Sequence, residues 1–375
     1  MRASGPGRST PQGGLTVIGG DPRREGCRGA VSVEHRHVHT TSLADIPEVE
    51  QRSPSGKFLS FARNISIALG CIRNVGTWGG GHPFDVQVRR LPPGASVCPF
   101  HAHLHQWEFF LVRSGRGTVR TEHGVDPVAP GDFFLHPPGE AHQLTNTGAE
   151  DLVVLIVADN PALDACYYPD SDKWGLRPPD VFFRATSAHY FDGEDVYDAA
   201  QPPPGLLPLP TPTLPWGQRK RNVESLPWDA WTSPKGRFRG ESKELSLALG
   251  AQRNMPTGAG GHPFDVELGR LAPGESGCPF HSHAAQWELF IFLNGPASVR
   301  AGSETREFAA GSVVLHPPGE AHQFRNNGST PLDYLLIADN PPVDYWHYPD
   351  SNKWGLRAPR KFFRMVEADY YDGEE

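Results

Sequence analysis

The sequence repeats itself once, and this repeat constrains the fold more than any other feature. The segment GGHPFDV at 80–86 recurs at 260–266, and LHPPGEAHQ at 135–143 recurs at 315–323. In both pairs the second copy lies 180 residues after the first (260 − 80 and 315 − 135). A chain of 375 residues with such a duplication is expected to fold as two similar domains of roughly 150 residues each.

The repeat also sets the expected domain boundaries. Residues 1–44 have no counterpart in it, and their Gly, Ser, Arg and Pro content without hydrophobic periodicity predicts a disordered N-terminal tail. Residues 195–224 include seven prolines among the fifteen positions 201–215, a composition typical of a semi-rigid linker. We therefore expect a first domain at 45–194 and a second at 225–375.

Within each repeat, short runs rich in β-branched and aromatic residues are separated by Gly, Pro and Asn. VQVRRL at 86–91 and LVVLIVAD at 152–159 are two such runs, and LSLALG at 245–250 indicates a short helix. The 41 glycines and 38 prolines suit tight turns and argue against a helical bundle. We predict an all-β fold in which each repeat forms an antiparallel closed or jelly-roll barrel.

Composition excludes several classes of function. A net charge of −8 with 21% charged residues lacks the basic patch of a nucleic-acid binder. No stretch approaches the ~18 consecutive apolar residues of a membrane span, and the N-terminus lacks the apolar core of a secretory signal. The five cysteines are far apart and form no CxxC, so neither a disulfide framework nor a zinc ribbon is implied. We expect a cytoplasmic protein with a small-molecule substrate or ligand and no nucleic-acid or membrane partner; a homo-oligomer stays possible.

One cluster of residue types in the first repeat carries chemistry. His101 and His103 are two apart in a strand context, so both imidazoles point to the same face. Glu108 would alternate to the opposite face unless a bulge or turn re-aims it, and His142 follows a Pro-Pro-Gly turn much later. Three imidazoles and one carboxylate form a mixed set of ligands suited to Mn, Fe, Ni, Cu or Zn. The second repeat supplies the same four residue types: His281, His283, Glu288 and His322.

The spacing of these residues resembles a known family. HxHxxxxExxxxxxG at 101–115 resembles the first cupin motif, and GxxxxxPxGxxHxxxN at 131–146 resembles the second. The copies at 281–295 and 311–326 match equally well, so the chain is similar to the bicupins of a bacterial subgroup. The resemblance implies two tandem double-stranded β-helix barrels. It also implies one divalent transition metal (Fe, Mn, Ni or Zn) near the middle of each barrel, bound by the two quartets.

Other polar residues near the motifs allow more than one interpretation. His136 and His316 precede the Pro-Pro-Gly turns, and packed strand histidines are favoured over a role behind the ligands or in acid–base chemistry. Arg120 and Arg300 could meet an anionic substrate, although solvated strand ends are the favoured interpretation. With Arg113 they are the basic candidates near the site, and no catalytic residue beyond the ligands is assigned.

The ligand set indicates several reaction classes. Four protein ligands around an octahedral ion leave two adjacent positions, where a substrate can chelate or can bind beside O2. The first hypothesis is an Fe(II)- or Mn(II)-dependent oxygenase or related oxidoreductase acting on a small polar molecule. The alternatives are a non-oxidative isomerase, epimerase or decarboxylase of a sugar or organic acid, and a non-catalytic ligand-binding cupin.

Overall fold

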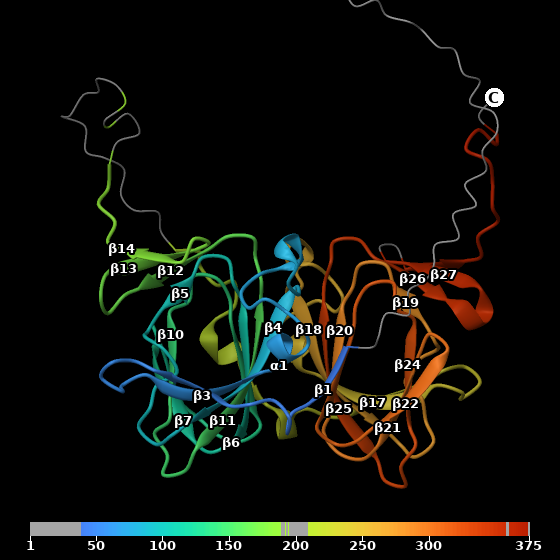
Figure 1. The fold of residues 1–375 in the computed structure, drawn as a ribbon, viewed down its shortest axis with the longest axis horizontal. Coiled ribbons are helices and arrows are strands. Elements are labelled where there is room, and N and C mark those ends of the chain that lie inside the picture. The colour runs from blue at the N-terminus through green and yellow to red at the C-terminus, as the bar shows by residue number, and fades with distance from the viewer. Residues whose placement is uncertain (1–38, 189–191, 193, 195–208, 358–359, 374–375) are drawn as a thin grey trace, which may run out of the picture. The chain divides into compact units, whose positions relative to one another are not determined.

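The structure, a computed structural model, describes residues 39–188, 192, 194, 209–357 and 360–373 and folds them into two β-barrels (Figure 1). The helices α1 (Ile65–Ala68) and α2 (Leu245–Ala248) are single turns, and nearly all other regular structure is strand. The all-β prediction is confirmed, and α2 is the short helix expected at 245–250. Within the described residues, no helix is long and apolar enough to cross a membrane.

The first barrel combines one large sheet with two smaller ones. Its strands are β2 (Val49–Arg52), β3 (Leu59–Asn64), β4 (Phe84–Leu91), β5 (Ala102–His103), β6 (Glu108–Ser114), β7 (Gly117–Thr121), β8 (Gly124–Val128), β9 (Asp132–His136), β10 (His142–Thr145), β11 (Leu152–Asp159), β12 (Asp164–Tyr168), β13 (Lys173–Arg177), β14 (Val181–Phe183) and β15 (Lys220–Asn222). The large sheet has the order β15-β9-β6-β11-β4-β3-β2, and the smaller sheets are β10-β7-β8 and β14-β13-β12-β5. Every pairing is antiparallel.

The second barrel repeats this arrangement. Its strands are β1 (His39–Ser42), β16 (Asp229–Thr232), β17 (Arg239–Glu244), β18 (Phe264–Leu271), β19 (Ser282–His283), β20 (Glu288–Phe292), β21 (Ala297–Ala301), β22 (Glu304–Phe308), β23 (Ser312–His316), β24 (His322–Asn326), β25 (Leu332–Asp339), β26 (Tyr345–Tyr348), β27 (Lys353–Leu356) and β28 (Lys361–Phe363). The large sheet has the order β1-β23-β20-β25-β18-β17-β16, beside sheets β22-β21-β24 and β19-β26-β27-β28. Short 3₁₀ turns connect the strands of both barrels: η1 (Thr77–Gly79), η2 (Trp216–Gln218), η3 (Val223–Ser225), η4 (Thr257–Ala259) and η5 (Pro349–Ser351).

Each large sheet is buried on both faces, which explains its continuous apolar runs. Along β6, Phe110 and Val112 point into the first barrel, whereas Phe109 and Leu111 join a core cluster that includes residues of both barrels. The rings of Phe84 and Phe264, at equivalent positions of the two repeats, meet in that shared cluster with centroids 6.5 Å apart. The two barrels therefore share one hydrophobic core in addition to their separate interiors.

The edge strands are exchanged between the barrels, which corrects the predicted boundaries. β1 lies inside the predicted tail 1–44, yet it pairs with β23 of the second barrel, as the blue strand in the orange half of Figure 1 shows. β15 lies inside the predicted linker 195–224 and pairs with β9 of the first barrel. The sequence predicts a tail and a linker here because these short polar strands carry little hydrophobic pattern. Residues 1–38 and 195–208 lie outside the described residues.

The C-terminal part of the predicted linker packs tightly on the first barrel. Trp216 is buried and lies parallel to His136, with ring centroids 5.2 Å apart. The buried Arg219 donates from both terminal nitrogens to the Glu140 carboxylate, at 2.5 and 2.6 Å. A charge-assisted pair of this kind fixes the position of both partners. Residues 216–222 are thus part of the wall of the first barrel and not an exposed spacer.

Two reciprocal ring contacts join the barrels. Trp107 of the first barrel packs on His262 of the second with ring centroids 5.2 Å apart, and Trp287 packs on His82 at 5.1 Å. Both histidines are buried, and burial lowers the pKa of each imidazole from 6.5 to about 4. The folded protein therefore holds both rings in the neutral form at neutral pH.

Removal of β1 should destabilise the second barrel. A chain that begins at residue 45 loses the strand that pairs with β23, whose backbone groups then face solvent. At about 0.5–1.5 kcal/mol for each net hydrogen bond, we expect the melting temperature to fall by several degrees relative to a chain that begins at His39. Calorimetry of the two truncated proteins measures the difference, and equal melting temperatures would contradict the strand exchange.

The contact between the barrels should weaken in acid. In the unfolded chain His82 and His262 titrate near ~6.5, whereas in the folded chain their pKa is about 4. The unfolded state thus binds more protons between these values, so this contribution is complete above pH 6.5 and is lost as the pH falls toward 4. We expect the free energy of unfolding from urea titrations to fall over this range, and to fall less steeply in the double variant His82→Phe/His262→Phe. Parallel curves for the two proteins would refute this assignment.

Candidate metal centres

The ring orientation of two first-barrel histidines is set by backbone carbonyls. Nδ1 of His101 lies 2.9 Å from the carbonyl oxygen of Pro99, and Nδ1 of His142 lies 3.1 Å from that of Glu140. A carbonyl oxygen only accepts, so Nδ1 carries the proton in both rings. Their Nε2 lone pairs are consequently free to bind a metal.

A carboxylate performs the same task for the third histidine. Nδ1 of His103 donates to Oδ2 of Asp164 at 2.6 Å, and both side chains are buried. The sulfur of Cys166 lies 3.3 Å from the same nitrogen. The sequence reasoning missed Asp164, whose only signal is an Asp at the matching position of both repeats, as Asp164 and Asp344.

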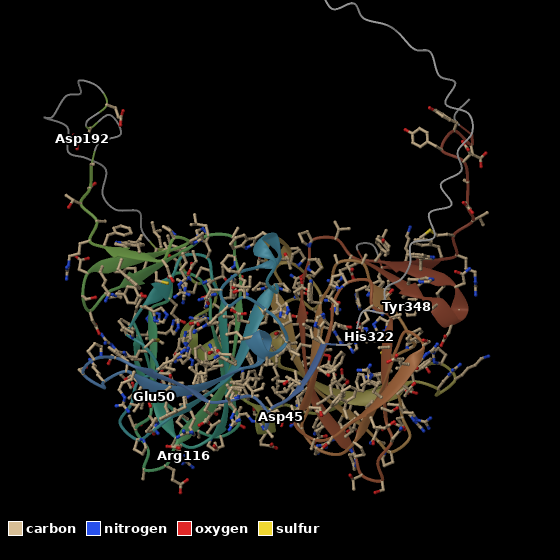
Figure 2. The ribbon with its side chains drawn as sticks, in the orientation of Figure 1. Asp45, Glu50, Arg116, Asp192, His322 and Tyr348 are labelled. Carbon is tan, nitrogen blue, oxygen red and sulfur yellow. The ribbon has the colours of Figure 1, made fainter. Side chains whose placement is uncertain are left out.

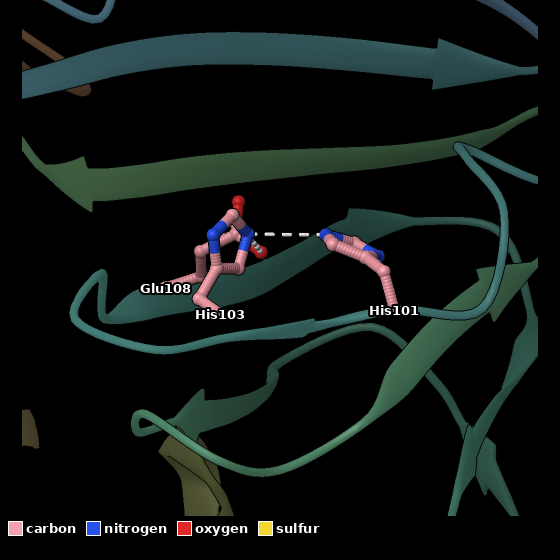
Figure 3. A group of neighbouring side chains, drawn as sticks. All are labelled: His101, His103 and Glu108. Carbon is pink, nitrogen blue, oxygen red and sulfur yellow. Dashed lines mark hydrogen bonds and ion pairs between the residues drawn. The ribbon is translucent and has the colours of Figure 1, made fainter. Parts of the chain in front are cut away.

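The four predicted residues of the first barrel converge on one point. Nε2 of His101 lies 3.1 Å from Nε2 of His103, which is 3.6 Å from Oε2 of Glu108 (Figure 3). The same carboxylate oxygen lies 2.8 Å from Nε2 of His142. Four donor atoms that face one another in this way match the ligand arrangement of a divalent transition metal.

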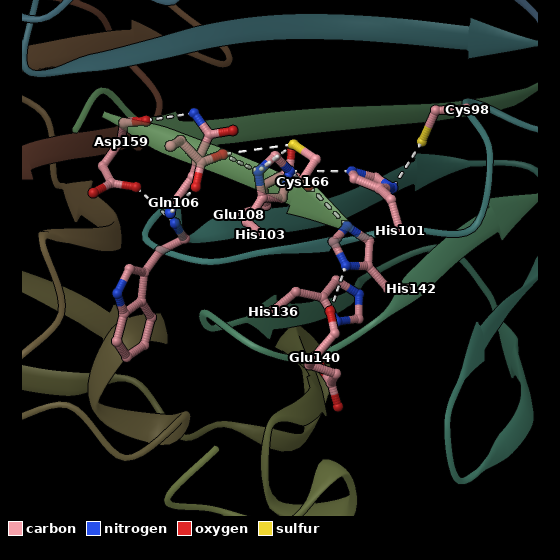
Figure 4. A network of polar contacts seen from close by, with 12 residues as sticks. Cys98, His101, His103, Gln106, Glu108, His136, Glu140, His142, Asp159 and Cys166 are labelled. Carbon is pink, nitrogen blue, oxygen red and sulfur yellow. Dashed lines mark hydrogen bonds and ion pairs between the residues drawn. The ribbon is translucent and has the colours of Figure 1, made fainter. Parts of the chain in front are cut away.

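A turn between β5 and β6 brings Glu108 to the histidines. Oδ1 of Asp164 accepts from the backbone N–H groups of His105 and Gln106, at 2.9 and 3.3 Å. Oδ1 of Asp159 accepts from the N–H of Trp107 at 2.6 Å (Figure 4). The turn breaks the alternation of the strand, so Glu108 begins β6 on the same side as the histidines. This is the turn that the sequence analysis requires for Glu108 to join them.

The second barrel brings its predicted quartet together in the same way. Nδ1 of His283 donates to Asp344 at 2.7 Å, and Glu288 lies 3.6 Å from Nε2 of His283. Oε2 of Glu288 and Nε2 of His322 are buried 2.8 Å apart without hydrogen-bond geometry. Two buried polar atoms left in this state are the arrangement that a metal ion would satisfy. The carbonyl oxygens of Pro279 and Glu320 hold Nδ1 of His281 and His322.

The ionised glutamate suits a metal ligand set, whereas one histidine favours its charged form. Burial would lower the pKa of His103, but its hydrogen bonds to Asp164, Cys166 and Glu108 raise that pKa well above 6.5, so a metal would displace a proton from this ring. Burial, together with neighbouring His142 and His103, lowers the pKa of His101 well below its usual value. Burial alone would raise the pKa of Glu108, but the hydrogen bonds from His103 and His142 outweigh it and hold that pKa well below 4.5. Glu288 is shifted in the same direction. Each site thus offers one carboxylate anion among imidazoles.

A further layer of aromatic rings supports the ligands. His136 is a packed strand histidine, as expected, and its ring stacks on His142 with centroids 3.9 Å apart (Figure 4). Nδ1 of His136 lies 2.6 Å from the Glu140 carboxylate that Arg219 binds. Equivalent contacts recur in the second barrel, where His316 stacks on His322 at 3.9 Å.

Tyrosines from the small sheets cover the other side of each site. Tyr168 lies nearly parallel to His101 with ring centroids 5.9 Å apart. Tyr348, labelled with His322 in Figure 2, lies against His281 at 6.0 Å. The ligand histidines are therefore held from two directions, and a cavity gives access to them.

The cavity at the first site contains arginines that the sequence reasoning missed. It measures about 120 Å³, and Arg73, Arg89 and Arg177 line it together with His101, His103 and Glu108. The second cavity measures about 160 Å³ and includes Arg253 and Arg357 with His283 and Glu288. Arg89 could have been found because it takes an inward-facing position of β4 by alternation.

The arginines predicted near the sites are engaged elsewhere. Arg120 forms a two-pronged salt bridge with Asp170, and Arg300 forms the same contact with Asp350, at 2.8–3.0 Å. Both pairs are well exposed to solvent. Arg113 does not line the cavity described for the first barrel.

Comparison with known proteins identifies the family. Residues 87–158 and 267–338 each match the family model described as a cupin domain, and each match contains strands of the large sheet and all four predicted ligands of its barrel. The chain is a bicupin of the cupin superfamily. The bicupin resemblance drawn from the two motif pairs is thus confirmed.

Individual relatives and solved structures resemble this bicupin over different lengths of the chain. Auxin-binding protein 1 of Arabidopsis thaliana is 27% identical over 167 residues, which are 42% of this chain and 75% of that protein. The oxalate-binding protein of Thermotoga maritima is 38% identical over 69 residues, or 18% of this chain and 55% of that protein. The crystal structure of an oxalate decarboxylase from Lactobacillus farciminis in complex with formate gives a TM-score of 0.48 at 15% identity, covering 80% of this chain and 86% of that one.

Each aspartate behind a ligand should control the affinity of one metal. We expect Asp164→Asn to weaken the first site by about 10–100-fold, because His103 loses the anion that orients it and increases its basicity. Asp344→Asn should weaken the second site alone. Metal titrations of the full chain, which should bind up to two ions, measure both effects, with Asp170→Asn as a surface control. Unchanged affinities in both variants would show that the quartets do not bind metal through these histidines.

Proposed function

We propose that this bicupin is a metal-dependent enzyme that acts on a small polar molecule, with one divalent transition ion in each barrel. The observation that carries the proposal is the quartet of converging donor atoms, of which His101, His103 and Glu108 line a small cavity in the first barrel. His101, His103, Glu108 and His142 would hold the ion of the first barrel, and His281, His283, Glu288 and His322 that of the second. The ion would supply a Lewis acid and, if it is redox-active, a means of using O2.

The chain itself would fix and shield the reacting groups. Asp164 and the carbonyl groups behind the imidazoles hold the ligands in one tautomer, so little reorganisation accompanies binding. Phe110 and Ile156 line the first cavity, and their apolar surfaces exclude water from one side of the site. Such a cavity fits a substrate of only a few non-hydrogen atoms.

Two reaction classes follow from this geometry. An Fe(II)- or Mn(II)-dependent oxygenase or related oxidoreductase is the first, because a ligand set of four leaves room for a substrate and O2. A non-oxidative reaction of an organic acid, such as a decarboxylation, is the second. The three arginines in the first cavity favour it, because guanidinium groups recognise carboxylates. The similarity to the Thermotoga protein, an oxalate-binding protein, supports the same class of substrate.

Oxygen dependence separates the two classes. Full-length protein loaded with Fe(II), Mn(II) or Zn(II) is supplied with small carboxylates, oxalate first, in air and under anaerobic conditions. Oxygen uptake in proportion to product would establish the oxygenase, whereas equal turnover without O2 and with Zn(II) would establish the non-oxidative reaction. The control is the variant His101→Ala/His103→Ala/His281→Ala/His283→Ala, which removes two ligands from each quartet and should lose activity in either case. Binding of metal and acid without turnover under all conditions would contradict an enzymatic role.

A further inference from the structure

The two cavities differ in charge at three equivalent positions. Asn64, Gln87 and Arg89 line the first, and the residues 180 positions later are Glu244, Glu267 and Gly269. Each difference makes the second repeat more negative by one unit, so together they change the formal charge by three units. Other charged positions, such as Asp85 and Asp265, are the same in both repeats.

Two of the three arginines of the first cavity, Arg73 and Arg89, lack a salt-bridge partner, whereas Nε of Arg177 lies 3.7 Å from Oδ1 of Asp180. Arg89 is 7% exposed, and its guanidinium contacts Oε1 of Gln87 at 3.1 Å and Oγ of Ser60 at 3.3 Å, both neutral groups. Neither Arg73 nor Arg89 forms a salt bridge within the described part of the chain. Burial and then the nearby charge of Arg73 lower the pKa of Arg89. A buried cation in this state is costly unless an anion joins it.

The second cavity provides counter-charges for Arg253. Its buried Arg357, the equivalent of Arg177, lies 4.0 Å from Oδ2 of Asp344 and leaves Nε and Nη1 without a hydrogen-bond partner in the described part of the chain. Arg253, the equivalent of Arg73, lies 2.9 Å from Oε1 of Glu244 and 3.1 Å from Oε2 of Glu267. No guanidinium can take the place of Arg89, because a Cβ on Gly269 would lie 2.1 Å from Cζ of Tyr334. The equivalent of Tyr334 in the first barrel is the smaller Val154, which leaves that space to Arg89.

The volumes of the two cavities give no reason for them to bind different ligands. The difference between them lies in the charge of their lining. The second cavity, at about 160 Å³, is no smaller than the first, at about 120 Å³. An anion entering the first meets Arg73 and Arg89, which have no salt-bridge partner, whereas in the second it meets Glu244 and Glu267. Burial and the neighbouring Glu244 raise the pKa of Glu267 to about 8, so at neutral pH the charge of this pair comes mainly from Glu244. In a site that excludes water, such differences act over several ångströms with little screening.

We propose that the two metal cavities bind different ligands: the first takes a small carboxylate held by Arg73 and Arg89 beside the metal quartet, and the second rejects it. This inference rests on the proposed metal sites and adds the substrate class and its restriction to one barrel. The first barrel is thus the site of carboxylate binding. Arg89 determines the specificity for a carboxylate in the first barrel. In the second barrel, Gly269 and the adjacent Tyr334 leave no place for an equivalent arginine.

Binding of an unreactive dicarboxylate tests this division. Isothermal titration of the Zn(II)-loaded full chain with malonate should give one bound malonate per chain, whereas the neutral malonamide should not bind measurably. Arg89→Gln should weaken malonate binding by about 10–100-fold, because a charge-assisted hydrogen bond is lost. Arg120→Gln, which alters an exposed arginine on the same barrel, should not change it. Metal content and melting temperature of each variant show whether the site is intact, and Arg89→Lys, which keeps the charge, should bind with intermediate affinity.

A transplant supplies the reverse test. The variant Glu244→Asn/Glu267→Gln/Gly269→Arg/Tyr334→Val gives the second cavity the lining of the first, and it should bind a second malonate. Two malonates per chain in the parent protein, full affinity in Arg89→Gln, or stronger binding of inorganic phosphate than of malonate would each overturn the proposal. These measurements need no turnover, so an inactive protein that binds one malonate through Arg89 would disprove the proposed enzymatic function and leave this inference standing.

Discussion

The two large sheets must satisfy two environments at once, and the rest of the structure depends on this constraint. Alternate residues of β6, β9 and β11 enter either the interior of the barrel or the core that the barrels share. A shift of one residue in register would exchange these sets and would move Glu108 away from the histidines. Because both faces of the sheet are closely packed, the register of the strands is strongly specified. The same register fixes the positions of the ligand residues at the ends of these strands.

The sequence was sufficient for the fold class, and the residues of each quartet lie together as it predicted, while their binding of a metal stays a prediction. The repeat, the strand runs and the cupin motifs are local patterns, and each can be recognised from spacing alone. From the sequence, Glu108 could join the histidines only if a bulge or turn changed the direction of its side chain. The turn that produces it depends on Asp159 and Asp164, which are more than 50 residues away along the chain.

The features that sequence reasoning missed all depend on contacts between distant segments. β1 and β15 are short and polar, so nothing in their composition reveals that they complete a sheet. Arg89 carries a charge in a strand of mostly apolar neighbours, and its partners Ser60 and Gln87 become meaningful only when the cavity is seen. The matching of the two repeats was the available signal: positions at which aligned copies differ in charge mark the places where their sites have diverged.

The exchanged edge strands have a consequence for how such a chain can be assembled. Each strand precedes the repeat to which it is joined in sequence but completes the sheet of the other repeat. This connectivity is what results when two copies of a single-repeat subunit that embrace each other with their N-terminal arms are joined end to end. One repeat made alone would have an N-terminal strand with no sheet edge to pair with, and a sheet edge with no strand to complete it. A second copy would supply both. Joining the copies in one chain makes the pair permanent, and each barrel can then acquire a lining of its own while its partner keeps the architecture intact.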